Sequence, residues 1–203
     1  MAPLVRRSWA PRGNTPILYQ RTRFHQKVSI IAGLCVNPSS DRIHLYFRLH
    51  PDENIKADSV IGFLRQLLRQ LDGPVILIWD RLMAHRAQKV KRFIDQRPEI
   101  QCFFLPPYAP ELNPVENVWG YLKMNPLANY APSDVDSLAI CTRRHARSVQ
   151  RRHRLLHAFL KRSPLFFHRV YDIIYAALNS FFMPVPCVIE SFLVERSDHG
   201  TGI

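Results

Sequence analysis

The chain has 203 residues with a formal net charge of +12, and 47% of the residues are hydrophobic, which is enough for the core of one domain. The excess of Lys and Arg predicts a polyanionic partner, because binding of these side chains to phosphates releases the counterions of the nucleic acid. The alternative is a generically basic protein without such a partner. Four scattered cysteines without a Cys-x-x-Cys pair argue against a zinc site or disulfides and favour reduced thiols in a cytoplasmic protein.

No apolar signal segment follows Met1, so no secretory leader is expected. Residues 170–188 are apolar but are interrupted by Asp172, Asn179 and two prolines, so no membrane span is predicted either. The first turn-rich segment, residues 6–17, carries three arginines that contact a nucleic-acid backbone or are simply solvated: Arg6, Arg7 and Arg12.

Two apolar runs, Lys27–Val36 and Ile43–Leu49, are separated by Asn-Pro-Ser-Ser, which predicts a β-hairpin. A helix with a periodic apolar stripe is then expected from Asp58, its capping residue, to Leu71.

Val75 to Trp79 is an unbroken apolar run after Gly-Pro, the pattern of a strand buried on both faces in an α/β sheet. Asp80 leaves the carboxyl end of this strand, where functional sites collect in open α/β sheets. The alternative is an aspartate that caps the following turn. A helix is predicted over residues 85–97, with Arg86 outward. His85 at its start is expected to assist near a metal site or contact phosphate, or to hydrogen-bond locally.

A further strand, residues 100–105, ends in a Pro-rich turn, and Asn113-Pro114 predicts a helix start with Asn113 as the N-cap. Glu116 then lies in the first turn, beside an apolar stripe that includes Trp119. The alternative is structural, because Asn113 and Glu116 nearly form a capping box. Arg143–Arg162 is predicted to be one basic amphipathic helix whose arginines, Arg151 and Arg152 among them, contact DNA or are solvated.

The segments IWDRLMAHRA and LPPYAPELNPVENVWGYLK resemble the second and third acidic motifs of bacterial insertion-sequence transposases related to the Tc/mariner elements, which are DDE endonucleases. RRSWAPRGNTPIL and RLLHAFLKRSPLFF are also similar to that family, so the resemblance covers roughly residues 4–167. Arg81 departs from the family, which often has a small polar residue there. The residues that match the family hallmark are Asp80, Asn113, Pro114, Glu116 and Trp119.

The resemblance implies an α/β, ribonuclease-H-like (retroviral-integrase-like) mixed sheet flanked by helices. The family's first catalytic aspartate belongs to a strand just upstream of RRSWAPRG, where this chain has only MAPLV. We therefore expect a catalytic domain over residues 1–167 that lacks its first strand, and a tail over residues 168–203 without family resemblance. Loss of that central strand would leave two unpaired strand edges and predicts poor solubility.

The resemblance also implies DNA transposition, with Asp80 and Glu116 as catalytic metal ligands and two Mg²⁺ (or Mn²⁺) ions in an intact centre. With the first aspartate missing, little or no strand cleavage is expected. A silent DNA-binding remnant and a stand-alone ribonuclease-H-like nuclease are the alternatives. Expected partners are DNA and a second copy or an intact transposase, in a nucleoid-associated cytoplasmic protein. The candidate DNA-binding residues are Arg6, Arg7, Arg12, His85, Arg86, Lys123, Arg151 and Arg152.

Overall fold

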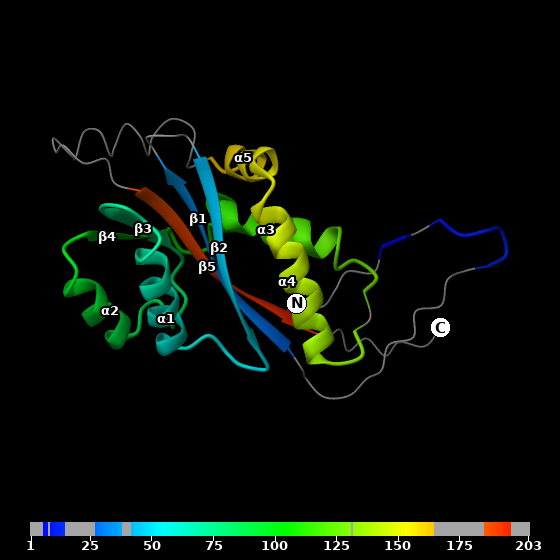
Figure 1. Ribbon diagram of the computed structural model, residues 1–203, viewed down its shortest axis with the longest axis horizontal. Helices are drawn as coiled ribbons and strands as arrows, with labels where there is room; N and C mark the ends of the chain where they lie inside the picture. The colour runs from blue at the N-terminus through cyan, green and yellow to red at the C-terminus, as the bar shows by residue number, and fades with distance from the viewer. Residues whose placement is uncertain are drawn as a thin grey trace.

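The computed structural model describes residues 6–7, 9–14, 27–37, 42–130, 132–164 and 185–195. A mixed five-stranded sheet in the order β2-β1-β5-β3-β4 forms the centre, and helices cover both of its faces (Figure 1). The predicted α/β fold class is confirmed. In chain order the elements are β1 (Lys27–Asn37), β2 (Arg42–Pro51), α1 (Ala57–Leu68), β3 (Val75–Trp79), α2 (Gln88–Asp95), β4 (Ile100–Phe104), the 3-10 turn η1 (Pro110–Leu112), α3 (Pro114–Met124), α4 (Val135–Gln150), α5 (His153–Lys161) and β5 (Val185–Glu195).

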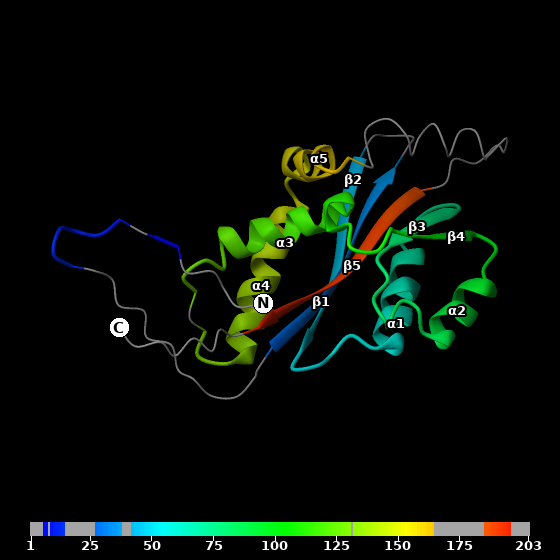
Figure 2. The same ribbon diagram turned by 180° about the vertical axis from the view of Figure 1, so that it is seen from behind.

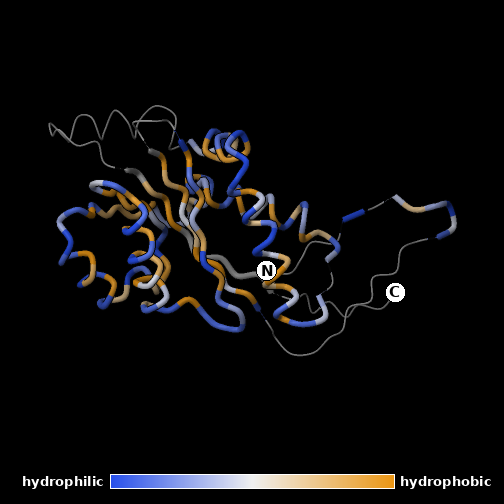
Figure 3. Tube along the Cα trace, viewed as in Figure 1, coloured by the Kyte–Doolittle hydropathy of each residue, from blue (hydrophilic) through white to orange (hydrophobic). Residues whose placement is uncertain are grey.

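β1 and β2 form the predicted antiparallel hairpin, in a register that places Val28 opposite Pro51. Three helices, α3, α4 and α5, lie over one side of the sheet, and α1 and α2 lie over the other (Figure 2). The sheet is therefore buried on both faces, as the apolar run of β3 predicts. In Figure 3 the hydrophobic residues run through the strands at the centre, whereas hydrophilic residues recur along the helices.

The alternation of side chains along the strands separates two apolar clusters. Ile78 and Val188 belong to the cluster under α3, α4 and α5, which we call the α3 face. Trp79 and Ile189, the next residue of each strand, belong to the cluster under α1 and α2. Neighbouring positions of a strand thus face opposite sides of the sheet, and this fixes the face to which any strand residue belongs.

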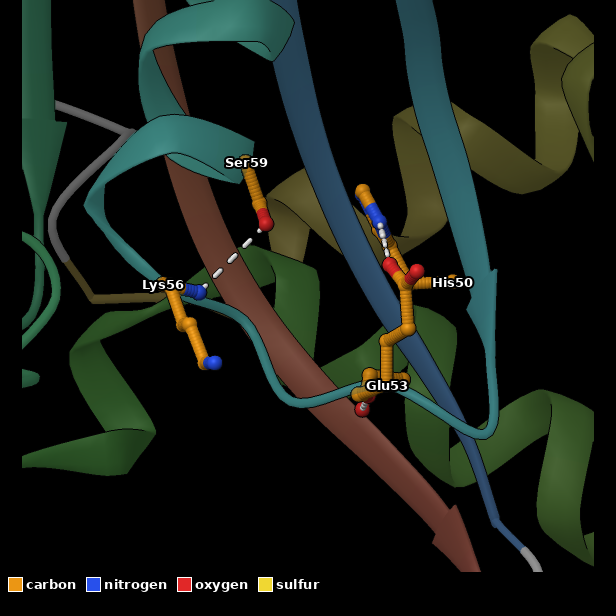
Figure 4. Close-up of polar contacts among 5 residues, drawn as sticks. His50, Glu53, Lys56 and Ser59 are labelled. Carbon is orange, nitrogen blue, oxygen red and sulfur yellow. Dashed lines mark hydrogen bonds and ion pairs between the residues drawn. The ribbon is translucent and has the colours of Figure 1, made fainter.

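The predicted cap of α1, Asp58, is wrong, because the helix begins at Ala57 and its N-cap lies two residues before Asp58. Lys56 holds the N-cap position and its backbone N–H donates to Ser59 Oγ at 3.4 Å (Figure 4). Ahead of the helix, Nδ1 of His50, near the end of β2, lies 3.4 Å from Oε2 of Glu53. Asp58 stands in the first turn of α1, where it pairs with Lys89 at the start of α2.

The central position of the sheet is occupied by β5, antiparallel to β1 and parallel to β3. This corrects the expectation of two unpaired edges between those strands. The physical reason is that a strand from the segment expected to be a tail pairs on both of its sides, with Ile189 opposite both Gly33 and Trp79. The boundary proposed at Phe167 lies outside the described residues.

A disulfide joins Cys35 of β1 to Cys187 of β5, which corrects the expectation that all cysteines are reduced. The two residues are partners in the antiparallel register, with Cα atoms 4.1 Å apart. Spacing along the chain gave no hint of this pair, because it depends on where β5 enters the sheet. Cys102 and Cys141 are free thiols.

The basic segment Arg143–Arg162 is not one helix, because α4 ends at Gln150 and α5 begins at His153. The chain bends there so that Val149 and Leu156 can bury in the same cluster under the sheet. Gln150 Nε2 also donates to the carbonyl of Leu45 at 2.7 Å, which ties the end of α4 to β2. No helix in the described part of the chain is long and apolar enough to cross a membrane.

Candidate active site

The candidate site lies where β3 and β4 end and α3 begins. β3 and β4 are parallel, with Trp79 opposite Phe104, so their carboxyl ends meet at one edge. The N–H of Leu105 donates to the carbonyl of Trp79 at 2.8 Å, which continues the pairing one residue further. The Pro-rich turn after Leu105 then leads to α3, and this path brings Glu116 to the edge where Asp80 leaves β3.

Asp80 Oδ1 accepts two hydrogen bonds. The N–H of Leu82 donates at 3.0 Å, as expected for an aspartate in a turn, and His85 Nδ1 lies 2.6 Å away. Burial raises the pKa of Asp80, but the hydrogen bond and charge of His85 and the Leu82 N–H outweigh it, so the net shift is downward. The carboxylate is therefore ionised at neutral pH, with about a third of the side chain, 34%, exposed to the cavity and solvent.

His85 has a fully buried side chain, 0% exposed, that stacks on Trp79 with ring centroids 4.6 Å apart and planes 7° apart. A covered ring does not reach DNA, so the predicted phosphate contact is not supported. The local hydrogen bond that was the alternative is present, and it goes to Asp80. His85 thus orients the Asp80 carboxylate.

Glu116 stands in the first turn of α3, as predicted, and is half-buried. Asn113 is the N-cap, because its Oδ1 accepts from the N–H of Val115 at 3.1 Å. The N–H of Asn113 itself donates to the carbonyl of Pro110 at 2.9 Å, so this donor is satisfied without the Glu116 carboxylate. The structure therefore removes the main reason to assign Glu116 to a capping box.

Asp80 and Glu116 line one cavity of about 480 Å³. Two exposed arginines, Arg81 and Arg86, line it as well, and Arg81 Nε donates to the carbonyl of Leu105 at 3.1 Å. Tyr108, fully exposed with a positive φ of 57°, lies in the Pro-rich wall. A second cavity of about 400 Å³ shares Glu116 and adds Arg162. The acids thus lie among cations, which suits a polyanionic substrate.

The sequence did not identify Arg81 or Tyr108 as site residues, and it placed Arg162 only in the basic helix, without a position near Glu116. Arg81 directly follows Asp80, and this adjacency was the available indication. Tyr108 lies in the Pro-rich turn, so its position within the motif pointed to it as well. Arg162 was hidden by the expectation of a single long helix, because its place beside Glu116 depends on the bend between α4 and α5.

The remaining predicted DNA-binding residues are distributed over several surfaces. Arg86 lines the cavity with the two acids. Arg6, Arg7 and Arg12 are exposed, and the N–H of Arg6 donates to Asn129 Oδ1 at 2.6 Å. Arg151 and Arg152 are exposed at the bend between α4 and α5.

Lys123 is only 8% exposed on α3, so a DNA contact for Lys123 is not supported. The reason is its place on the helix, one residue after Leu122 on the side that packs into the core. Within the described ranges, no group of three or more His, Cys, Asp or Glu side chains is placed to hold a metal ion. The acidic side chains that line the cavity are Asp80 and Glu116.

Comparison with known proteins gives three findings. A family model described as DDE superfamily endonuclease matches residues 2–139. The uncharacterised protein y4pE/y4sA of Sinorhizobium fredii is 41% identical over 77 residues, which are 37% of this chain and 54% of that protein. A crystal structure of the Mos1 strand transfer complex is similar with a TM-score of 0.44 and 19% identity, covering 83% of this chain and 52% of that one. The chain thus spans about half the length of each of these two proteins.

Proposed function

Because the chain belongs to the DDE superfamily endonuclease family, we propose that it is a metal-dependent nuclease domain acting on DNA in transposition. The observation that carries the proposal is the shared cavity of Asp80 and Glu116, two acids far apart in the sequence that the fold brings to one sheet edge. Such a pair of carboxylates, one just after β3 and one in the first turn of α3, fits phosphoryl transfer assisted by divalent cations.

The donor set fits magnesium or manganese. Both side chains offer only oxygen ligands, and the lowered pKa of Asp80 keeps that carboxylate charged and ready to bind a cation at neutral pH. A cavity of about 480 Å³ leaves space for water and a phosphate group beside the acids. When bound, the metal would polarise the attacking and leaving oxygens of an in-line displacement at phosphorus. Asp80 and Glu116 would hold it, and His85 would keep Asp80 in place.

The cations around the cavity support DNA as the substrate. Arg81 and Arg86 line the cavity of the two acids, and Arg162 lines the second cavity, which shares Glu116. Guanidinium groups suit phosphate oxygens, because they donate in a fixed, planar fork. Arg151 and Arg152 at the bend between α4 and α5 would extend the contact along the backbone. Association with a second copy or with an intact transposase, and a place at the nucleoid, belong to the same proposal.

A second candidate function is a catalytically silent DNA-binding protein. It is favoured by the finding that the described part of the cavity offers two acids where the family resemblance implies three. Such a protein would bind DNA without metal and with a strong salt dependence, and it would leave the strands intact.

Nicking of supercoiled plasmid by the purified full chain, with Mg²⁺ or Mn²⁺, separates the two functions. The proposed nuclease loses nicking in both Asp80→Asn and Glu116→Gln, and keeps it in the control Asp72→Asn, an exposed acid in the turn before β3. Salt-sensitive binding with no nicking by the unmodified chain would establish the silent form. Nicking that survives both substitutions would refute the assigned site.

A further inference from the structure

The central strand β5 brings another acid to the edge of the sheet. Parallel pairing aligns Ile189 of β5 with Trp79, the last residue of β3. Glu190 and Asp80 are the residues that follow these two partners. In the antiparallel direction Glu190 is the partner of Ala32. Pairing with β1 therefore places Glu190 itself, and pairing with β3 places the residue before it.

The same pairing fixes the face of the sheet. Ala32, the partner of position 190, and Val188, two residues before it, both belong to the α3 face. Ile78 of β3, the register partner of Val188, belongs to it too, and Asp80 follows the end of that strand. Glu116 is in the first turn of α3, a helix that covers this face. Position 190 and Glu116 thus lie on the α3 side of the sheet, and Asp80 shares one cavity with Glu116.

The α3-face residues next to position 190 along the strand and across the register are Val188 and Ala32, and both are fully buried. Ala32 is also the smallest side chain in the apolar part of β1 on this face, so the register partner takes up little space.

We propose that Glu190, carried by β5 to the register position beside Asp80, is the third carboxylate of the metal centre formed by Asp80 and Glu116. This inference rests on the proposed metal-dependent function. It assigns the third acid that the family resemblance implies to a residue of β5.

Metal binding by the full chain tests the inference without relying on catalysis. Mn²⁺ affinity, measured by calorimetry, is expected to fall about tenfold or more in Glu190→Gln, as in Asp80→Asn and Glu116→Gln, because each loses a direct ligand. The matched control is Glu195→Gln, on the same strand but five positions further along and therefore assigned to the opposite face. The control is expected to bind Mn²⁺ as the unmodified chain does.

Two additional measurements make each result decisive. The Cys35–Cys187 disulfide, detected by mass spectrometry without reduction, reports that β5 is in place in the Glu190→Gln variant. Iron bound in the site, with ascorbate and peroxide, is expected to cut the backbone near residues 80, 116 and 190.

The outcomes distinguish the two proposals. Weakened binding in all three variants with the disulfide intact, and backbone cuts near residue 190, would support Glu190 as a ligand. Unchanged Mn²⁺ affinity in Glu190→Gln alone, or cuts confined to residues 80 and 116, would overturn this inference and leave the two-acid site standing. Unchanged affinity in Asp80→Asn and Glu116→Gln would instead overturn the proposed function. A chain without the disulfide would refute the placement of β5 on which the inference depends.

Discussion

His85 Nδ1 lies 2.6 Å from Asp80 Oδ1, and the same imidazole ring is stacked on Trp79, the residue immediately before Asp80. The histidine is thus clamped between the last residue of β3 and the acid that follows it. This arrangement fixes the direction of the carboxylate before any ligand arrives, and it opposes the effect that burial alone would have on the pKa of Asp80.

Replacing His85 by Phe keeps an aromatic ring for Trp79 but removes the nitrogen that faces Asp80. We expect the pKa of Asp80 to rise, because burial is then opposed only by the Leu82 N–H. Carbon-13 NMR titration of the Asp80 carboxyl measures this directly. An unchanged pKa in His85→Phe would show that the hydrogen bond does not control the ionisation of Asp80.

The same shift determines how stability depends on pH. Because the folded pKa of Asp80 lies below its ordinary value of 3.8, ionised Asp80 stabilises the fold above that value, and this contribution is lost as the pH falls through the lowered pKa. Urea unfolding between about pH 2 and 7 should therefore show a smaller acid-induced loss in His85→Phe than in the unmodified chain. The effect is modest, about 1 kcal/mol, because Asp80 is partly exposed.

Asn113 sets the start of α3 and so the place of Glu116. Asn113→Ala removes the acceptor of the Val115 N–H and is expected to cost about 1 kcal/mol of unfolding free energy, measured by urea denaturation. Asn113→Ser is the matched control, since serine caps nearly as well. If alanine and serine give equal stability, the side-chain cap contributes nothing here.

The cysteines give a test of the sheet order. Alkylation of the unfolded chain without reduction is expected to label Cys102 and Cys141 alone, and prior reduction should expose all four thiols. In the folded chain Cys102 should react slowly at about pH 8, because burial raises its pKa to about 11 and the thiolate is the reactive form. Mass spectrometry of peptides gives both results. Four labelled thiols before reduction would contradict the pairing of β1 with β5.

The basic surface gives a further prediction. Arg86 is exposed in the cavity wall, so Arg86→Gln is expected to remove about one phosphate contact. The slope of the logarithm of DNA affinity against the logarithm of salt concentration should become shallower by the corresponding amount. Lys123→Met should leave that dependence unchanged, because Lys123 is buried on α3. Fluorescence anisotropy over a range of salt concentrations measures both. If the salt dependence of DNA affinity fell equally in the two variants, burial of a side chain in the free protein would not predict whether it contacts DNA.

The sequence predicted the parts of this fold that depend on neighbours along the chain. The hairpin of β1 and β2, the buried strand β3 and the Asn113 cap all follow from local patterns. What it could not predict depends on long-range pairing. β5 enters between β1 and β3, and its bond from Cys187 to Cys35 follows from that register rather than from any motif.

For the candidate site too, local sequence patterns predicted some features, and tertiary packing determined the others. Asp80 and Glu116 were predicted because each ends or begins an element, and the cavity they share agrees with that expectation, although their metal binding stays a prediction. The burial of His85 and Lys123 could not be predicted, because the faces of α3 and of the turn after β3 are set by tertiary packing.

The strand order also has a consequence for biosynthesis. Among the strands of the described residues, β5 is translated last, yet it separates the hairpin of β1 and β2 from the pair β3 and β4. While the ribosome is still making residues 185–195, those two halves have no sheet bonds to each other. Contacts between residues this distant slow folding, because the loop must close before they are made. The inner edges of β1 and β3 therefore stay unpaired in the nascent chain, and accessible to chaperones, until β5 emerges from the exit tunnel.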